Sequence, residues 1–298
     1  MASIMVAENK GYLRRKILAW IDIIRVGNCI ALGYATIVGY ILGGSKVFDQ
    51  AMLFKLFIAA FVIGGSSNII NDYFDASIDA INKPWRPIPM GLIKANEAYF
   101  VSLIMGFIGI ILSFTITYMN GIVALIAFAL AYLYSFKLKK VLLVGNLIVA
   151  FSAALSIIYG GFASTNIVID TVLATLFAFL LNFGRELLKG IEDVEGDKKY
   201  YIRTLAAVKG IKVAYVSSLI VFIILMLLSI IPYVFIGYSM YYLIMTLCGV
   251  DLVIIVALTI ASSLQPKDAL RSTRMLKVAV FVGITAFFVE GLKKYFIV

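Results

Sequence analysis

Apolar runs of about 20 residues recur along the whole chain, and a helix of that length crosses the roughly 30 Å hydrocarbon core of a bilayer. The chain has 298 residues, of which 63% are hydrophobic and only 14% are charged. A soluble domain of this size does not need so much apolar sequence. Runs this long are also too long for strands, and in lipid a helix satisfies its own backbone polar groups. The sequence therefore predicts an all-α membrane protein.

Hydropathy and the positions of helix-breaking residues predict nine membrane spans. We expect them at residues 18–43, 51–70, 97–118, 120–136, 141–163, 168–188, 212–232, 239–262 and 277–297. No long linker or low-complexity segment separates them, so we expect a single integral-membrane domain over residues 1–298. The basic start of the chain leads into the first span without a small-residue cleavage pattern, which favours an uncleaved anchor.

The distribution of lysine and arginine predicts the orientation, because these residues favour the cytoplasmic side of a membrane. With the N-terminus inside, most of the 26 basic residues fall in the inner segments. The outer exceptions are Lys46, Lys55, Lys293 and Lys294. The formal net charge of +10 therefore reflects topology and does not indicate nucleic-acid binding. We expect a multi-pass protein of the cell membrane whose N-terminus and active-site loops are cytoplasmic.

The residues available for metal binding are restricted. The chain has no histidine, and its two cysteines, Cys29 and Cys248, lie inside predicted spans without metal-binding or disulfide spacing. Any metal site must therefore use oxygen ligands, which favour hard cations such as Mg²⁺.

Three aspartates, Asp72, Asp75 and Asp79, follow the second predicted span at helical spacing. Residues three and four apart lie on one side of a helix, so these carboxylates would repel one another unless a cation lay between them. Solvated loop acids or helix N-caps are the ordinary alternative. Repetition of the same pattern later in the chain disfavours that alternative.

The second cluster consists of Asp193 and Asp197 at the end of the sixth span, with Glu186 about two turns earlier on a similar face. Two carboxylate faces at one membrane depth would suit two or more Mg²⁺ ions that clamp a diphosphate, because Mg²⁺ bridges carboxylate and phosphate oxygens. Nearby cations would complete the coordination of the anion, or would be ordinary inner-loop residues. They are Lys83, Arg86, Lys137, Lys139, Lys140, Lys198, Lys199 and Arg203.

An internal repeat relates the two clusters. Gly27–Asn28 recurs as Gly145–Asn146, and Asp75 and Asp79 recur as Asp193 and Asp197, at the same separation along the chain. This agreement predicts two four-helix halves, residues 18–136 and 141–262, followed by a ninth helix. Four spans per half preserve orientation, so the duplication would be parallel. Chance agreement is the alternative.

Both clusters resemble motifs of the UbiA-type intramembrane prenyltransferases. NDYFDASID, residues 71–79, resembles the NDxxDxxxD motif, and INKPWRPIPMG, residues 81–91, resembles the Arg-Pro-x-Pro segment after it. DVEGDKKYYIRTL, residues 193–205, is similar to the second DxxxD motif. The nine-span plan agrees, so the resemblance covers nearly the whole chain. It implies helices around a central cavity and Mg²⁺-dependent transfer of a polyprenyl group from its diphosphate.

The resemblance also implies residue roles. The catalytic and metal-binding residues would be Asp72, Asp75, Asp79, Asp193 and Asp197. The substrate-binding residues would be Asn68, Asn71, Arg86, Tyr134, Lys137, Lys189 and Arg203. One departure concerns Lys189, since some members have an aspartate there, one turn before the second motif. The second cluster would then hold metal with fewer carboxylates.

RELLKGIEDVEGD, residues 185–197, is most similar to archaeal members of the family. Those members join geranylgeranyl diphosphate to the hydroxyl of geranylgeranylglyceryl phosphate, which implies these two substrates besides membrane lipid, and no protein partner. Lys137, Lys139 and Lys140 would then have an acceptor phosphate to bind. We expect the diphosphate to leave first and the acceptor oxygen to trap the allylic cation in an apolar tunnel. The departing diphosphate or an aspartate would take the proton.

Two other functions remain open. The first is prenyl transfer to an aromatic ring in quinone or haem synthesis. The second is transport, which usually places ionisable groups near the bilayer midplane. Only Asp251 lies mid-span, where we expect a neighbouring helix to satisfy it. Asp22 and Arg25, near the inner end of the first span, would pair with each other.

Overall fold

The computed structural model describes residues 2–44, 49–164 and 167–296. Within these residues the chain is helical and contains no strand, which confirms the all-α prediction. The first helices are α1 (Ala2–Ile24), α2 (Val26–Leu42), α3 (Gln50–Asn82), α4 (Ala95–Phe114), α5 (Tyr118–Phe136), the 3₁₀ turn η1 (Leu138–Lys140) and α6 (Val144–Ala163). The later ones are α7 (Ile169–Glu192), α8 (Val194–Lys199), α9 (Leu205–Lys209), α10 (Ile211–Ser229), the π-helices η2 (Pro232–Ile236) and η3 (Met245–Asp251), α11 (Met240–Ile244), α12 (Leu252–Ala261) and α13 (Pro266–Phe296).

Eight helical stretches in the described chain are long and apolar enough to cross a membrane. The end of α1 and the whole of α2 meet at a 43° bend and form one further span if they are taken together. The chain is therefore a multi-pass membrane protein whose eight or nine spans agree with the prediction. Lys46 and the last residue of the final predicted span, residue 297, lie outside the described residues.

α3 is longer than the apolar run that predicted it. It begins at Gln50, where the Asp49 side chain caps the backbone N–H of Ala51 at 2.9 Å, and it continues to Asn82. Helix propagation depends on backbone hydrogen bonds rather than on apolar side chains, so the helix runs through the first acidic cluster. The three aspartates are therefore fixed on the same rigid element as the membrane span.

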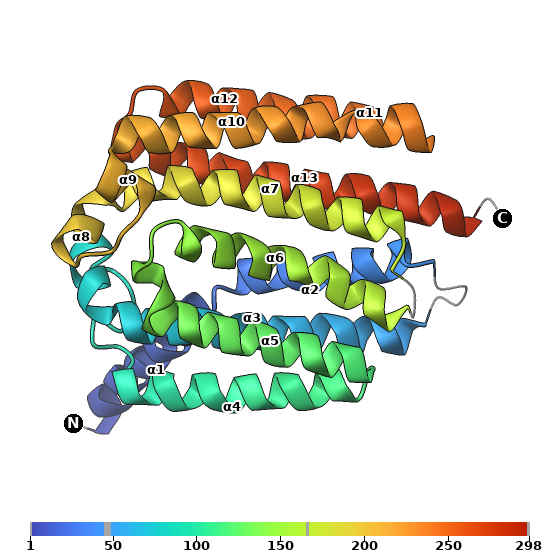
Figure 1. Ribbon diagram of the computed structural model, residues 1–298. Helices are drawn as coiled ribbons and strands as arrows, with labels where there is room; N and C mark the ends of the chain where they lie inside the picture. Colours follow the sequence, from blue (N-terminus) through green and yellow to red (C-terminus); the bar gives the residue numbers. More distant parts are fainter. Residues whose placement is uncertain (1, 45–48, 165–166, 297–298) are drawn as a thin grey trace.

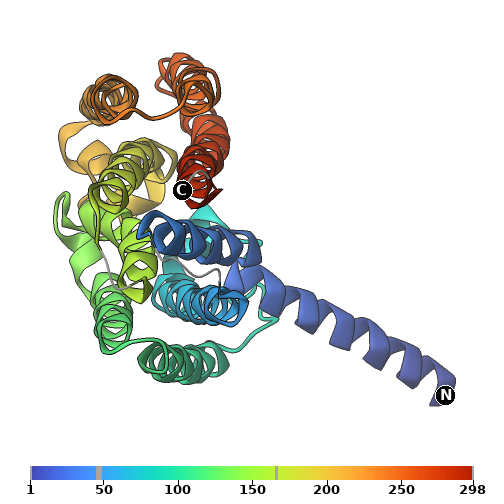
Figure 2. The same ribbon diagram turned by 90° about the vertical axis from the view of Figure 1, so that its right-hand side faces the viewer.

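Consecutive helices lie side by side, and the bundle closes on itself (Figures 1 and 2). Contacts follow the chain through α2, α3, α4, α5, α6, α7, α10, α12 and α13. α13 then returns to contact both α2 and α7. α1 extends away from this bundle, with the N-terminus at its far end (Figure 2).

α2 and α6 cross at backbone contact. A Cβ atom on Gly39 would lie 1.9 Å from the carbonyl oxygen of Ile157, and one on Gly160 would lie 1.9 Å from that of Thr36. Only glycine fits at these two positions. Small residues allow membrane helices to approach closely, and here they join the two predicted halves.

The ends of α3 and α7 that carry the acidic clusters lie at the same end of the bundle (Figure 1), and α8 contacts both helices. Tyr200, which follows α8, donates from its hydroxyl to the carbonyl oxygen of Ser77 in α3 at 2.9 Å. Gly196 in α8 lies so near Asn82 that an added Cβ would be 2.1 Å from its amide. The segment after α7 is thus packed against the end of α3.

The predicted repeat begins with a similar backbone turn in each half. Arg25 precedes α2 with φ 56°, and Leu143 precedes α6 with φ 64°. Each of these left-handed residues stands directly before a Val-Gly-Asn sequence. The duplication and its halves, residues 18–136 and 141–262, remain a prediction.

Candidate active site

A cavity of about 840 Å³ lies among α2, α3, α5, α6, α7 and α13. One part of its wall is polar and is built from the ends of α3 and α7. The remainder is largely apolar and includes Ile63, Val123, Ile148 and Val149. A ligand with a charged head and an apolar tail matches this division.

The first acidic cluster is held by two arginines. Asp72 and Asp79 are 3% and 5% exposed, and Arg86 bridges them from the loop after α3. Its Nη1 atom lies 2.8 Å from Asp72 Oδ1 and 2.6 Å from Asp79 Oδ2. Arg25 also forms an ion pair with Asp72. Burial lowers the pKa of Arg86, but Asp72 and Asp79 outweigh that effect and raise the pKa above its usual value.

Asp75 points to a different partner. Its carboxylate forms an ion pair with Lys139, whose side chain is buried at the 3₁₀ turn η1 between α5 and α6. Asn71, one turn earlier on α3, donates to Ser135 Oγ in α5 at 3.5 Å. The acidic face of α3 is thereby connected to the next part of the cavity wall.

Lys83 joins the two clusters. It follows α3 directly, and its Nζ atom lies 2.9 Å from Asp193 Oδ1 at the end of α7. Asp197, in α8, accepts a hydrogen bond from Thr204 Oγ1 at 2.9 Å. Burial, and to a lesser degree Asp193, raises the pKa of Asp197 to about 7. Unlike the first cluster, the second spans a break between helices, because α7 ends at Glu192 and α8 begins at Val194.

Glu186 is a buried acid between two cations of its own helix. Arg185 Nη1 lies 3.1 Å from Glu186 Oε1, and Lys189 Nζ lies 3.3 Å from Glu186 Oε2. Lys189 therefore neutralises Glu186, one turn earlier on α7. Some members of the family that the sequence resembles have a carboxylate in place of this lysine.

The cavity wall contains most of the predicted site residues, namely Asn68, Asn71, Asp75, Asp79, Arg86, Tyr134, Lys189, Asp193, Asp197 and Arg203. Asp72 reaches the wall through Arg86. Lys137 is exposed before η1 and is not among the wall residues. The roles of all these residues remain predictions.

Sequence reasoning missed several cations of the site. The pair expected between Asp22 and Arg25 does not form, because the bend at Arg25 directs its side chain to Asp72 on α3. Arg185, Arg274 and Lys277 also line the cavity and were not predicted. The Gly-Asn repeat next to Arg25 was a usable signal for that residue, whereas nothing local distinguished the other three.

The carboxylates fit a hard cation by chemistry, since Asp75, Asp79, Asp193 and Asp197 line one cavity and offer only oxygen donors. No group of three acids or other ligands close enough to hold a metal occurs within the described ranges. Most of these acids bind a lysine or arginine instead. The donor set therefore suits a metal that enters together with an anionic ligand. The lysine and arginine side chains that now pair with the acids would then bind this anion.

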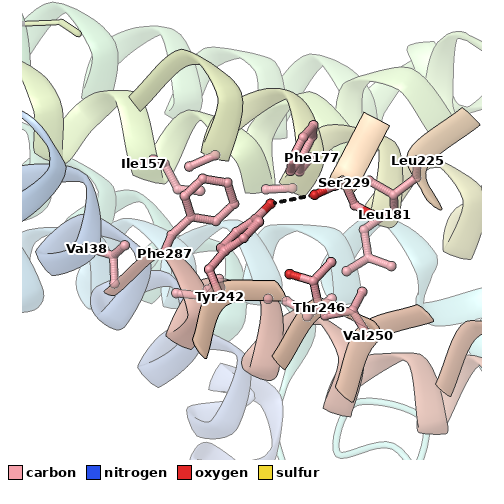
Figure 3. Close-up of a pocket in the computed structure, with 15 residues that line it drawn as sticks. Val38, Ile157, Phe177, Leu181, Leu225, Ser229, Tyr242, Thr246, Val250 and Phe287 are labelled. Carbon is pink, nitrogen blue, oxygen red and sulfur yellow. Dashed lines mark hydrogen bonds between the residues drawn. The ribbon is translucent and has the colours of Figure 1, made fainter. Parts of the chain in front are cut away.

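A second, apolar cavity of about 40 Å³ adjoins the first, among α7, α10, η3 and α13 (Figure 3). Ile157, Ala178, Val280 and Ile284 belong to both walls, so the small cavity continues the apolar part of the large one. Tyr242 donates from its hydroxyl to the carbonyl oxygen of Ser229 at 3.1 Å (Figure 3).

Asp251, the mid-span carboxylate, is buried at the end of η3. One oxygen accepts from Ser229 Oγ of α10 at 3.3 Å, as expected for an acid satisfied by a neighbouring helix. Its other oxygen has no partner within the described chain.

Residues 32–281 match the model of the UbiA prenyltransferase family. Two relatives named digeranylgeranylglyceryl phosphate synthase are similar over most of the chain. The one from Sulfurisphaera tokodaii is 37% identical, and the match covers 85% of this chain and 91% of the relative. The one from Methanocaldococcus jannaschii is 33% identical, with coverage of 95% and 99%.

Solved structures agree with this match. A structure described as that of a digeranylgeranylglyceryl phosphate synthase in membranes superposes with a TM-score of 0.73 at 33% identity, and the match covers 94% of this chain and 99% of the other. A UbiA homologue from Archaeoglobus fulgidus bound to DMAPP and Mg²⁺ gives a TM-score of 0.67 at 18% identity, with coverage of 94% and 99%. The second likeness concerns the fold alone.

Proposed function

The chain belongs to the UbiA prenyltransferase family, and we propose that it transfers a geranylgeranyl group from geranylgeranyl diphosphate to the free hydroxyl of geranylgeranylglyceryl phosphate. This reaction builds the ether lipids of archaeal membranes. The observation that carries the proposal is one cavity that combines two acid–cation clusters with a long apolar wall. The relatives named for this activity support the choice of substrates.

The proposed cofactor is Mg²⁺, held by Asp72, Asp75, Asp79, Asp193 and Asp197. When bound, the metal would neutralise negative charge on the diphosphate and make it a better leaving group. UbiA homologues have been solved with prenyl diphosphates and Mg²⁺, which supports this assignment.

Three cations of the clusters would bind the diphosphate oxygens. Lys83, Arg86 and Lys139 are already within reach of the aspartates, at the polar end of the cavity. Guanidinium and ammonium groups form strong hydrogen bonds to phosphate, so these side chains would stabilise the charge that develops as the C1–O bond breaks.

The apolar wall has a separate task. Side chains such as Val123, Ile148 and Val149 would surround the prenyl chain and keep water from the allylic cation. The acceptor hydroxyl oxygen would form the new ether bond to C1 as the C1–O bond to the diphosphate breaks, and would lose its proton to the departing diphosphate or to an aspartate. This transfer needs no histidine, which the chain lacks.

We place the polar end of the cavity on the cytoplasmic side of the cell membrane. The loops at that end carry Lys83 and Arg86 after α3, the lysines of η1, and Lys198 and Lys199 in α8. This concentration of positive charge follows the positive-inside rule.

The direct test is an assay of the purified protein with Mg²⁺, labelled geranylgeranyl diphosphate, and either geranylgeranylglyceryl phosphate or 4-hydroxybenzoate. We expect product only with the glyceryl phosphate, and none when the metal is chelated. Asp72→Ala and Asp193→Ala should each abolish turnover in folded protein. Asp268→Ala should not, because Asp268 pairs with Arg271 and does not line the cavity. Product with 4-hydroxybenzoate alone would select prenylation of aromatic rings instead.

A further inference from the structure

One face of α13 lines the main cavity and changes from polar to apolar along its length. The residues on this face recur at intervals of three and four, as on a single side of a helix. They are Leu270, Thr273, Arg274 and Lys277, followed by Val280, Phe281 and Ile284. The stretch from Arg274 to Ile284 is about 15 Å long at the rise of an α-helix.

The cations of this face have no acidic partner. Most other cations of the cavity wall pair with a carboxylate, for example Lys83 with Asp193 and Lys139 with Asp75. Arg274 and Lys277, by contrast, form no ion pair with any described residue, although both line the cavity. Their charges are therefore available to a ligand.

Further cations surround Lys277. Arg185 on α7 donates from Nε to the carbonyl oxygen of Thr273 at 3.2 Å, which fixes its guanidinium beside the start of this face. Arg25, Arg185, Lys189 and Arg274 are all close enough to repel Lys277. Arg185 and Lys189 share Glu186, and Arg25 pairs with Asp72, whereas Arg274 and Lys277 form no ion pair within the described chain. Unpaired cations are stabilised when an anion binds among them.

α3 also lines the cavity with a face that changes from polar to apolar along the helix. Its wall residues are Asp79, Asp75 and Asn71 toward the polar end, followed by Gly64, Ile63 and Ala60. α2 lies between the two helices and contacts both. The cavity therefore has two walls that run from charged to apolar. The α3 wall is rich in acids, whereas the charged wall residues of α13 itself, Arg274 and Lys277, are cations. One acid of α7, Glu192, lies beside them and accepts a hydrogen bond from Thr273 Oγ1 at 3.1 Å.

We propose that Arg274 and Lys277, with Arg185 beside them, bind the phosphate of the acceptor lipid, and that Val280, Phe281 and Ile284 receive its chain. This inference rests on the proposed function and assigns the two substrates to different walls. It replaces the expectation that Lys137, Lys139 and Lys140 bind the acceptor phosphate, because Lys139 pairs with Asp75 and the other two do not line the cavity. The reacting hydroxyl of the acceptor lies on the glycerol between phosphate and chain. An acceptor held by its phosphate at the polar end of α13 would present that hydroxyl beside the diphosphate site on α3.

Arg271 provides a matched control. It lies on α13 one turn before Arg274, but its side chain is 70% exposed and pairs with Asp268 at 3.1 Å. It is not among the cavity-wall residues. If the α13 cations serve only to attract the anionic membrane surface, removal of Arg271 and of Arg274 should have similar effects.

The experiment measures KM and kcat for Lys277→Met, Arg274→Gln and Arg271→Gln, with each substrate varied in turn. We expect KM for geranylgeranylglyceryl phosphate to rise about tenfold or more in the first two variants, which corresponds to the loss of one charge-assisted contact. KM for geranylgeranyl diphosphate should stay within about twofold, and Arg271→Gln should match the wild type. Lys277→Arg should restore a low KM.

A second readout uses geranylgeranylglycerol, the acceptor without its phosphate. The wild type should prefer the phosphorylated acceptor, and Lys277→Met should reduce that preference. An unchanged acceptor KM in both variants, or an equal rise for both substrates, would overturn the phosphate site. A wild-type enzyme that converts neither acceptor would overturn the proposed function itself, so the two failures are distinguishable.

Discussion

Among single side chains, Arg86 is notable because its guanidinium pairs with two buried carboxylates at once. It lies outside the helices and bridges two buried aspartates a helical turn or more apart. Removal of one partner from a buried ion pair leaves an unpaired charge and destabilises a protein by about 3 kcal/mol or more. We therefore expect Arg86→Ala to lower the unfolding temperature in detergent and to abolish turnover. Arg86→Lys should keep the fold but lose most activity, because an ammonium group cannot replace the planar guanidinium.

The contrary result would be an active, fully stable Arg86→Ala protein. Lys198→Ala is a suitable comparison, since Lys198 is an exposed cation in α8 that does not line the cavity.

The pKa of Asp197 predicts that both stability and Mg²⁺ affinity depend on pH. Burial raises its pKa from 3.8 to about 7, so the folded protein holds this proton over a range where the unfolded chain has lost it. Its contribution to stability is fully present below pH 3.8 and is lost as the pH rises through about 7. Metal binding requires the carboxylate, so Mg²⁺ affinity should rise between pH 6 and 8, by up to about tenfold per pH unit below the pKa.

Isothermal titration with Mg²⁺ and inorganic diphosphate across this pH range measures the effect. Asp197→Asn should bind more weakly and with a flatter pH profile. A wild-type affinity that is constant from pH 6 to 8 would exclude a proton on Asp197 as the cause.

Among the helices, α2 and α6 make the closest contact. A methyl group on Gly39 or Gly160 would meet backbone oxygen at 1.9 Å, and backbone cannot move aside as a flexible side chain can. We expect Gly39→Ala and Gly160→Ala each to destabilise the protein by about 1–3 kcal/mol, or to separate the helices and prevent folding. Thermal unfolding in detergent measures this.

Gly283→Ala in α13 is the matched control, because its new Cβ would find its nearest neighbour at 3.6 Å, an ordinary contact. Equal stability of the three alanine variants would show that the α2–α6 crossing can relax.

Local sequence patterns predicted the helices better than their ends. The apolar runs located the spans because burial in lipid demands them. The same runs stopped α3 too early, since the acidic stretch from Asn71 to Asn82 is also helical, and they missed the break at Asp193 between α7 and α8. The π-helical segments η2 and η3 left no signal in the hydropathy pattern.

The site was predictable only in part, for a related reason. Their repeated spacing identified the aspartates, because residues three or four positions apart lie on the same face of a helix. Their partners come from distant segments, as Lys139 does for Asp75 and Arg25 does for Asp72. No local pattern encodes a contact between helices, so Arg274 and Lys277 also became visible only in three dimensions.

For the whole molecule, the cavity draws its two acidic clusters from opposite halves of the predicted duplication. A ligand that bound both clusters would hold the halves together and stabilise the folded state by mass action. We expect Mg²⁺ and diphosphate together to raise the unfolding temperature by more than the sum of their separate effects. Differential scanning fluorimetry in detergent measures this.

The comparison for that measurement is Asp193→Ala, which removes an acid of the second cluster and should reduce the joint effect. Additive effects of the two ligands in the wild type would contradict a shared site.

The pairing of most cluster aspartates with lysine or arginine has a consequence for binding, because a ligand must exchange ion partners with these pairs. The resting form of the site carries built-in counter-ions, so a metal and a pyrophosphate group would bind by exchanging partners with them. The ammonium and guanidinium groups would leave the acids to the metal and pass to the incoming anion. Each exchange would keep the local charge nearly balanced, and neither ion would complete it alone.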